Sequence, residues 1–104
     1  MKRNILVKNK LDRYKMNVLW INNLDKLEVI DDNSIKNLDD RVKDWKNYIS
    51  LVNSIFDSMN QEYAELLKAV YIEYKTAEEL YYSTTTFYWK HRHAVNEFLE
   101  FFNF

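Results

Sequence analysis

The segment TAEELYYSTTTFYWKHRHAV, residues 76–95, decides how the second half of this chain is organised. At its start, Thr76 and Glu79 have the spacing of a capping box, in which each side chain hydrogen-bonds a free backbone amide in the first turn of a helix. This pair predicts a short helix over residues 77–82. Because the segment contains no glycine or proline, the turn that follows has to be made by other residues.

A longer helix is predicted directly after this turn, over residues 84–102, with Ser83 as its N-cap. The side that faces the core is predicted from the helical spacing of Phe87, His91, Ala94, Val95, Phe98 and Phe102. The opposite side carries Thr84, Thr85, Tyr88, Trp89, Arg92 and Asn96. One side of this helix is therefore expected to pack, and the other is a candidate binding surface.

Three further helices are predicted upstream. Apolar residues at every third or fourth position indicate a long helix over residues 4–29 and a second over residues 34–59, which the sequence DDNS at 31–34 can cap. Asn60 can cap a third helix, which we expect to end near residue 74. The chain is thus predicted to be all-α, with two long helices followed by a short, short, long trio.

The composition limits the class of protein. With 104 residues, of which 47% are hydrophobic and 30% charged, we expect one helical domain, residues 1–104, with a helical hairpin in 1–59 and the trio in 60–104. Cysteine is absent, and no segment has the length of a signal peptide's apolar region or of a membrane span. These features favour a cytoplasmic location. The aromatic tail FLEFFNF, residues 98–104, is expected to pack on the long helices or on a second chain.

The order of elements also has the layout of a DNA-binding helix-turn-helix. The run YIEYKTAEELYYSTTTFYWKHRHAVNEF, residues 71–98, is more specific. It resembles the carboxy-terminal half of phage-type transcription regulators of the RinA and ArpU kind, which are related to sigma factor region 4. The resemblance covers roughly residues 63–99 and includes the capped second helix, the serine in the turn, and the aromatic and basic residues of the last helix.

This resemblance implies a sigma region 4-like helix-turn-helix that binds double-stranded DNA and regulates transcription, without catalysis and without a cofactor. The residues expected in the major groove are Thr84, Thr85, Tyr88, Trp89 and Arg92. Those expected on phosphates are Lys90, Lys75 and the basic residues of the amino terminus. Helix-turn-helix proteins often bind as symmetric dimers, so we also expect a homodimer through the long helices and the aromatic C-terminus, and a contact with RNA polymerase.

Tyr81 departs from the pattern, because this family often has glycine or asparagine at the same place in the turn. A bulky residue held at positive φ is strained by about 1 kcal/mol or more. Two alternatives follow from this substitution. Either the turn avoids positive φ, or DNA binding has been lost.

Other interpretations of the same residues stay open. Tyr88 and Trp89 pack, in one alternative, against the first two helices or a second subunit instead of DNA. The amino terminus, in which six basic residues stand against Asp12 alone between residues 1 and 16, lies either along phosphates or in water. The whole chain is, in a further alternative, a helical interaction module that keeps the helix-turn-helix shape and binds a protein such as an RNA polymerase subunit.

Metal and enzyme functions are not expected. His91 and His93 stand two positions apart, so they do not share a helix face, and no cysteine or nearby carboxylate completes a ligand set. His91 is instead expected to be a half-buried core residue. A phosphate-binding loop, a nucleophile elbow and a dinucleotide fingerprint all need glycines, which this chain lacks.

Overall fold

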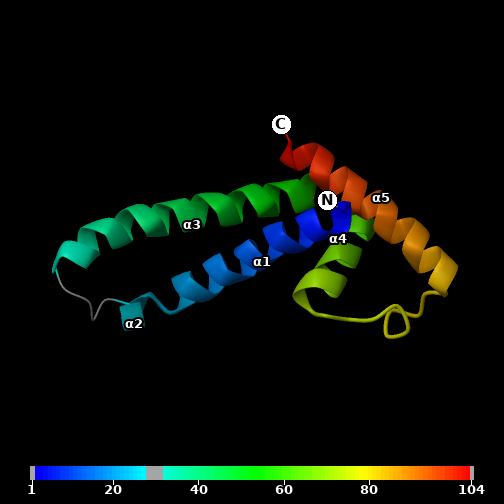
Figure 1. The fold of residues 1–104 in the computed structure, drawn as a ribbon, viewed down its shortest axis with the longest axis horizontal. Helices are drawn as coiled ribbons and strands as arrows, with labels where there is room; N and C mark the ends of the chain where they lie inside the picture. Colours follow the sequence, from blue (N-terminus) through cyan, green and yellow to red (C-terminus); the bar gives the residue numbers. More distant parts are fainter. Residues whose placement is uncertain (1, 28–31, 104) are drawn as a thin grey trace.

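The computed structural model describes residues 2–27 and 32–103, and all regular elements in this part of the chain are helical (Figure 1). In chain order they are α1 (Arg3–Asn22), α2 (Leu24–Leu27), α3 (Asp32–Ser58), α4 (Gln61–Leu67), η1 (Lys68–Ile72) and α5 (Thr84–Phe102). The predicted all-α fold is confirmed. Figure 1 shows α1 and α3 running antiparallel, with α4 and α5 at the end of the pair where α1 begins. None of the described helices has an apolar stretch of the length that crossing a membrane requires.

The first long helix ends earlier than the predicted range of 4–29. Asn23 leaves the helical conformation, with φ −118° and ψ 25°. Its side-chain amide donates a hydrogen bond of 2.7 Å to the carbonyl of Leu19, and this satisfies a carbonyl that the helix end leaves free. The predicted helix was too long because the apolar residues of α2 continue the same spacing. Residues 28–29 of the predicted helix lie outside the described part of the chain.

The second long helix, α3, lies close to its predicted range of 34–59. The expected cap in residues 31–34 falls partly outside the described residues. Two contacts between side chains fix the alignment of α3 on α1. The Tyr14 hydroxyl donates to Asn53 Oδ1 at 2.8 Å, and the rings of Trp20 and Trp45 lie 5.0 Å apart nearer the far end of the pair.

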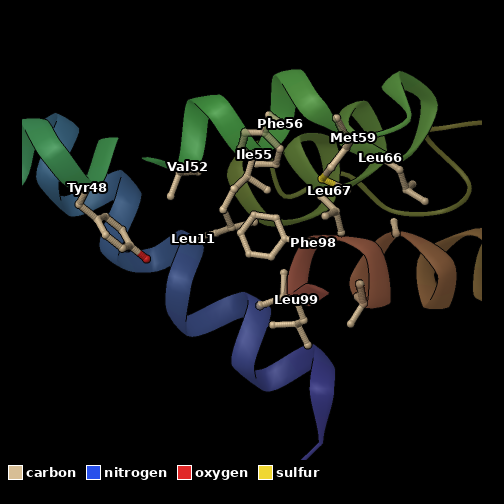
Figure 2. Packing of buried hydrophobic residues seen from close by; sticks show 14 residues of the cluster. Leu11, Tyr48, Val52, Ile55, Phe56, Met59, Leu66, Leu67, Phe98 and Leu99 are labelled. Carbon is tan, nitrogen blue, oxygen red and sulfur yellow. The ribbon is translucent and has the colours of Figure 1, made fainter. Parts of the chain in front are cut away.

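The hydrophobic core lies where α1, α3, α4 and α5 meet (Figure 2). Its largest fully buried apolar side chains are Phe56, Phe98, Leu11, Leu67, Val7 and Val52. The rings of Phe56 on α3 and Phe98 on α5 lie 5.7 Å apart, so the last helix is anchored to the hairpin by aromatic contact.

The aromatic tail, for which packing on the long helices or on a second chain was predicted, packs on the long helices. The Phe102 ring lies 6.0 Å from the ring of Tyr48 on α3, and the ammonium group of Lys10 on α1 lies 4.0 Å from the Phe102 ring centre. The end of α5 therefore packs on both long helices. Phe104, at the end of the tail, lies outside the described residues.

The predicted cap of the third helix is confirmed. The Asn60 side chain accepts a 3.0 Å hydrogen bond from the backbone N–H of Glu62. The backbone N–H of Asn60 in turn donates to the Glu97 carboxylate of α5 at 2.8 Å. The start of α4 is thereby tied to the last helix as well as capped by its own residue.

The third helix ends in a wider turn and at Ile72, slightly before the predicted end near residue 74. In η1 the backbone N–H of Glu73 donates to the carbonyl of Lys68 at 3.0 Å, which is the five-residue spacing of a π-helix. Tyr74 follows with φ 57°. Its ring lies 4.1 Å from the ammonium group of Lys15, so the strained residue is held by a contact with α1.

The predicted short helix over residues 77–82 is wrong as a helix, although its first signal is correct. The capping box forms, since the N–H of Glu79 donates to Thr76 Oγ1 at 3.2 Å and the N–H of Thr76 donates to the Glu79 carboxylate at 3.3 Å. Only one turn follows, because the chain closes into a helix-ending motif at Tyr81.

The closing turn has the hydrogen bonds of a Schellman motif. The N–H of Tyr82 donates to the carbonyl of Ala77 and the N–H of Tyr81 donates to the carbonyl of Glu78, each at 3.0 Å. Tyr81 has φ 60° and its side chain is 96% exposed. The alternative in which the turn avoids positive φ is therefore wrong. The other alternative, that DNA binding has been lost, stays a prediction that a binding measurement has to test.

Candidate nucleic-acid interface

Helix α5 is exposed along its first half and anchored in the core by its second half. Its buried residues are Ala94, Val95, Phe98 and Leu99. The first half carries the exposed residues that we call the outer face, namely Thr84, Thr85, Tyr88, Trp89 and Arg92. The side chain of Tyr88 is 65% exposed and that of Trp89 is 50% exposed. Five of the seven predicted site residues thus lie together on one open surface.

Ser83 fixes where the outer face begins. Its hydroxyl oxygen accepts a 3.3 Å hydrogen bond from the backbone N–H of Thr86, and its O–H donates to the Thr86 hydroxyl at 2.9 Å. The predicted N-cap is confirmed, and α5 starts at Thr84 as expected. Because Ser83 and Thr86 serve the cap, the hydroxyls of Thr84 and Thr85 are left at the surface.

His91 ties the inner side of α5 to the π-turn. Its Nε2 lies 2.7 Å from the hydroxyl of Tyr71 in η1, and its ring stacks on Phe87 with centroids 5.6 Å apart. Burial lowers the pKa of His91 below its ordinary value, because the charged imidazolium would lose hydration. As predicted, His91 is a half-buried packing residue, and it adds no positive charge to the outer face at neutral pH.

The aromatic residues of the outer face rest on their own helix. The Trp89 ring lies 4.3 Å from the ring of His93, which in turn stacks on Tyr63 of α4 at 6.3 Å. The Tyr88 ring meets the edge of Phe87 at 5.8 Å. Since half or more of Tyr88 and of Trp89 is exposed, neither side chain is packed into the two long helices.

Two predicted phosphate contacts, Lys90 and Lys75, are already paired with carboxylates. Lys90 forms an ion pair with Glu62 at the start of α4, and this hydrogen bond raises the pKa of the Lys90 ammonium group. Lys75 lies before α5 and pairs with Glu73 at 2.9 Å, which raises the pKa of Lys75 in the same way. Both lysines stay charged, but their charge is largely balanced within the protein.

The start of α1 lies beside the outer face. Arg3 donates through Nη1 to the Oδ1 atom of Asn96 on α5 at 2.8 Å. A shallow depression runs between the two helices and is lined in part by Arg3, Phe87, Tyr88, Arg92, Val95 and Asn96. Sequence reasoning counted Arg3 among the basic residues and put Asn96 on the open side of the last helix. The hydrogen bond between Arg3 and Asn96 could not be predicted from the sequence, because the two residues are 93 positions apart.

In the described part of the chain, His, Asp and Glu side chains do not gather in groups of three or more that could hold a metal ion. No family model, curated protein or solved structure matches this chain. The site therefore has to be interpreted from its own residues.

Proposed function

We propose that this protein is a DNA-binding transcription regulator, and that α5 is its recognition helix in a sigma region 4-like helix-turn-helix. The observation that carries the proposal is the outer face of α5, whose five residues are exposed while the second half of the same helix is anchored in the core. An α-helix presented in this way fits the major groove of B-DNA.

The residues of the outer face suit the two kinds of contact that such a helix makes. The hydroxyls of Thr84 and Thr85 donate to phosphates or base edges, and Tyr88 and Trp89 cover sugars or a thymine methyl group. Arg92 donates either to a phosphate or to the O6 and N7 atoms of guanine. The protein's role is binding alone, and it uses no cofactor.

The connection before α5 departs from the expected helix-turn-helix, because the helix predicted over residues 77–82 is a single turn closed at Tyr81. In the proposed arrangement this turn, held by the capping box and the two Schellman hydrogen bonds, takes the place of that helix and leads the chain to Ser83.

Fluorescence anisotropy of labelled AT-rich duplex DNA, measured at several salt concentrations, tests the proposal. Binding should weaken as salt rises, and Arg92→Ala should reduce the slope of log K against log salt by about 0.9 if Arg92 contacts a phosphate. Lys43→Ala is the matched control, because Lys43 is an exposed cation on α3 and is not among the residues expected on DNA. Failure of the wild-type protein to bind at low salt would refute the proposal.

A second candidate is a helical interaction module that binds a protein such as an RNA polymerase subunit. It is favoured by the exposed aromatic residues Tyr81, Tyr88 and Trp89, together with the carboxylate pairing of Lys90 and Lys75. Large exposed aromatic side chains are typical of protein interfaces. Capture of a purified polymerase subunit, lost in Trp89→Ala and insensitive to added DNA, would favour this candidate over the first.

A further inference from the structure

Arg3 and Arg92 come from opposite ends of the chain and lie beside the same turn of α5. Arg3 is hydrogen-bonded to Asn96, and Asn96 stands four positions after Arg92, so the two residues of α5 are neighbours on one side of the helix. Both arginines line the depression between α1 and α5, whose floor includes Phe87 and Val95. The basic start of α1 therefore extends the outer face.

Neither arginine forms an ion pair with a carboxylate among the described residues, in contrast to four of the lysines. In the part of the chain that the structure describes, Lys8, Lys15, Lys75 and Lys90 each pair with a carboxylate. Arg3 is recorded with one neutral acceptor, the Asn96 side chain. A guanidinium group carries five N–H donors, so most of the donor capacity of Arg3 remains for a ligand.

We propose that Arg3 and Arg92 together bind one phosphate group of a DNA strand, in the depression between the start of α1 and the middle of α5. The inference rests on the proposed function and adds a contact that α5 alone does not supply. Two guanidinium groups offer planar pairs of donors that match phosphate oxygens, and the apolar floor strengthens the charge-assisted bonds. Asn96 acts as a positioning residue, since it holds Arg3 beside α5 without being needed on the phosphate itself.

One shared phosphate has a measurable consequence that two separate contacts lack. If both arginines bind the same group, removal of one already loosens that group, and removal of the second costs less than it does in the intact protein. We expect Arg3→Ala and Arg92→Ala each to raise the DNA dissociation constant by about 10-fold, and the double variant to raise it by about 20- to 30-fold instead of 100-fold.

The experiment is a double-mutant cycle by fluorescence anisotropy at constant low salt, with Lys43→Ala on α3 as the control for loss of one positive charge. Arg3→Lys keeps the charge without the planar donors and should recover only part of the affinity. Asn96→Ala should weaken binding in the wild type but not further in Arg3→Ala. Circular dichroism melting of every variant checks that α1 still packs on α5.

Each outcome decides the matter. If Arg3→Ala binds like Lys43→Ala while Arg92→Ala is weakened, Arg3 is outside the site and the inference fails although the proposed function stands. If the double variant raises the dissociation constant by the full product of the two single increases, the arginines bind separate phosphates and the shared site is wrong. Absence of DNA binding by the wild type overturns both proposals.

Discussion

Replacement of Tyr81 by glycine is expected to stabilise this protein. Tyr81 has φ 60°, and its side chain is 96% exposed, so the substitution removes almost no packing. A residue with a Cβ atom pays roughly 1–2 kcal/mol in the left-handed region. Glycine has greater freedom in the unfolded chain, which offsets about 0.5–1 kcal/mol. The free energy of unfolding should therefore rise by about 0.5–1 kcal/mol.

Urea denaturation followed by circular dichroism at 222 nm measures this change, and a thermal melt should show a midpoint higher by about 2–6 °C. Tyr81→Ala is the decisive control, because alanine keeps the Cβ atom and so keeps the strain while it removes the phenol. We expect Tyr81→Ala to lie close to the wild type. A glycine variant no more stable than the alanine variant would show that the left-handed conformation at Tyr81 carries no such cost.

Tyr74 provides a second comparison, because it has nearly the same φ of 57° but a different use for its side chain. Its ring lies 4.1 Å from the Lys15 ammonium group, and Lys15 also donates to its hydroxyl. Tyr74→Gly both relieves the backbone strain at this position and removes the contact with Lys15. Its gain in stability should therefore be smaller than that of Tyr81→Gly, or absent.

Three further predictions concern single residues. Ser83→Ala should lower the free energy of unfolding by about 1 kcal/mol through loss of the α5 cap, and Ser83→Asp should keep most of it, as urea titrations will show. Asn17 is 1% exposed and its Nδ2 atom has no hydrogen-bond partner among the described residues, so Asn17→Leu should raise stability by about 1 kcal/mol in the same assay. The folded pKa of His91 lies below its ordinary value of about 6.5, so the unfolded chain takes up the proton first and stability falls as pH drops through the folded pKa. Between pH 7.5 and pH 5.5 the free energy of unfolding should fall less in His91→Gln than in the wild type. An equal fall in the two proteins would contradict the role of burial.

The last helix shows how much the sequence was able to predict. Its N-cap at Ser83, its range and its two sides are all local properties, because each depends on residues within a few positions of one another. The same is true of the cap at Asn60. Five candidate site residues could be placed on one surface for this reason alone.

Two helix predictions were wrong, the short helix over residues 77–82 and the end of the first long helix. In each case a correct local signal competed with a second signal nearby. The capping box of Thr76 and Glu79 forms, yet the helix it should start closes after one turn at Tyr81. Tyrosine is a poor residue for positive φ, so nothing in its chemistry predicts a helix end there. At Asn23 the side chain closes α1 by hydrogen-bonding Leu19, while the apolar spacing continues through the next helix.

Long-range pairings lay beyond sequence reasoning. Lys90 is expected on phosphates if its neighbours in the chain are all that is considered, but α4 places Glu62 against it. The bond between Arg3 and Asn96 depends on how α1 packs on α5, which no spacing within either helix encodes. The π-turn over Lys68–Ile72 is likewise invisible, since one extra residue in a helical turn hardly disturbs the apolar pattern.

The contact between α1 and α5 also bears on the order in which the molecule can become active. During synthesis the start of α1 is made first, but its partner Asn96 is made 93 residues later. The hairpin of α1 and α3 can form before then, since its contacts lie within the first part of the chain. The proposed two-arginine site has to wait for α5, because closure of so long a loop comes late in folding. In a nascent or truncated chain without α5, Arg3 lacks the Asn96 side chain that holds it, so the proposed two-arginine site is expected to form only when the last helix docks.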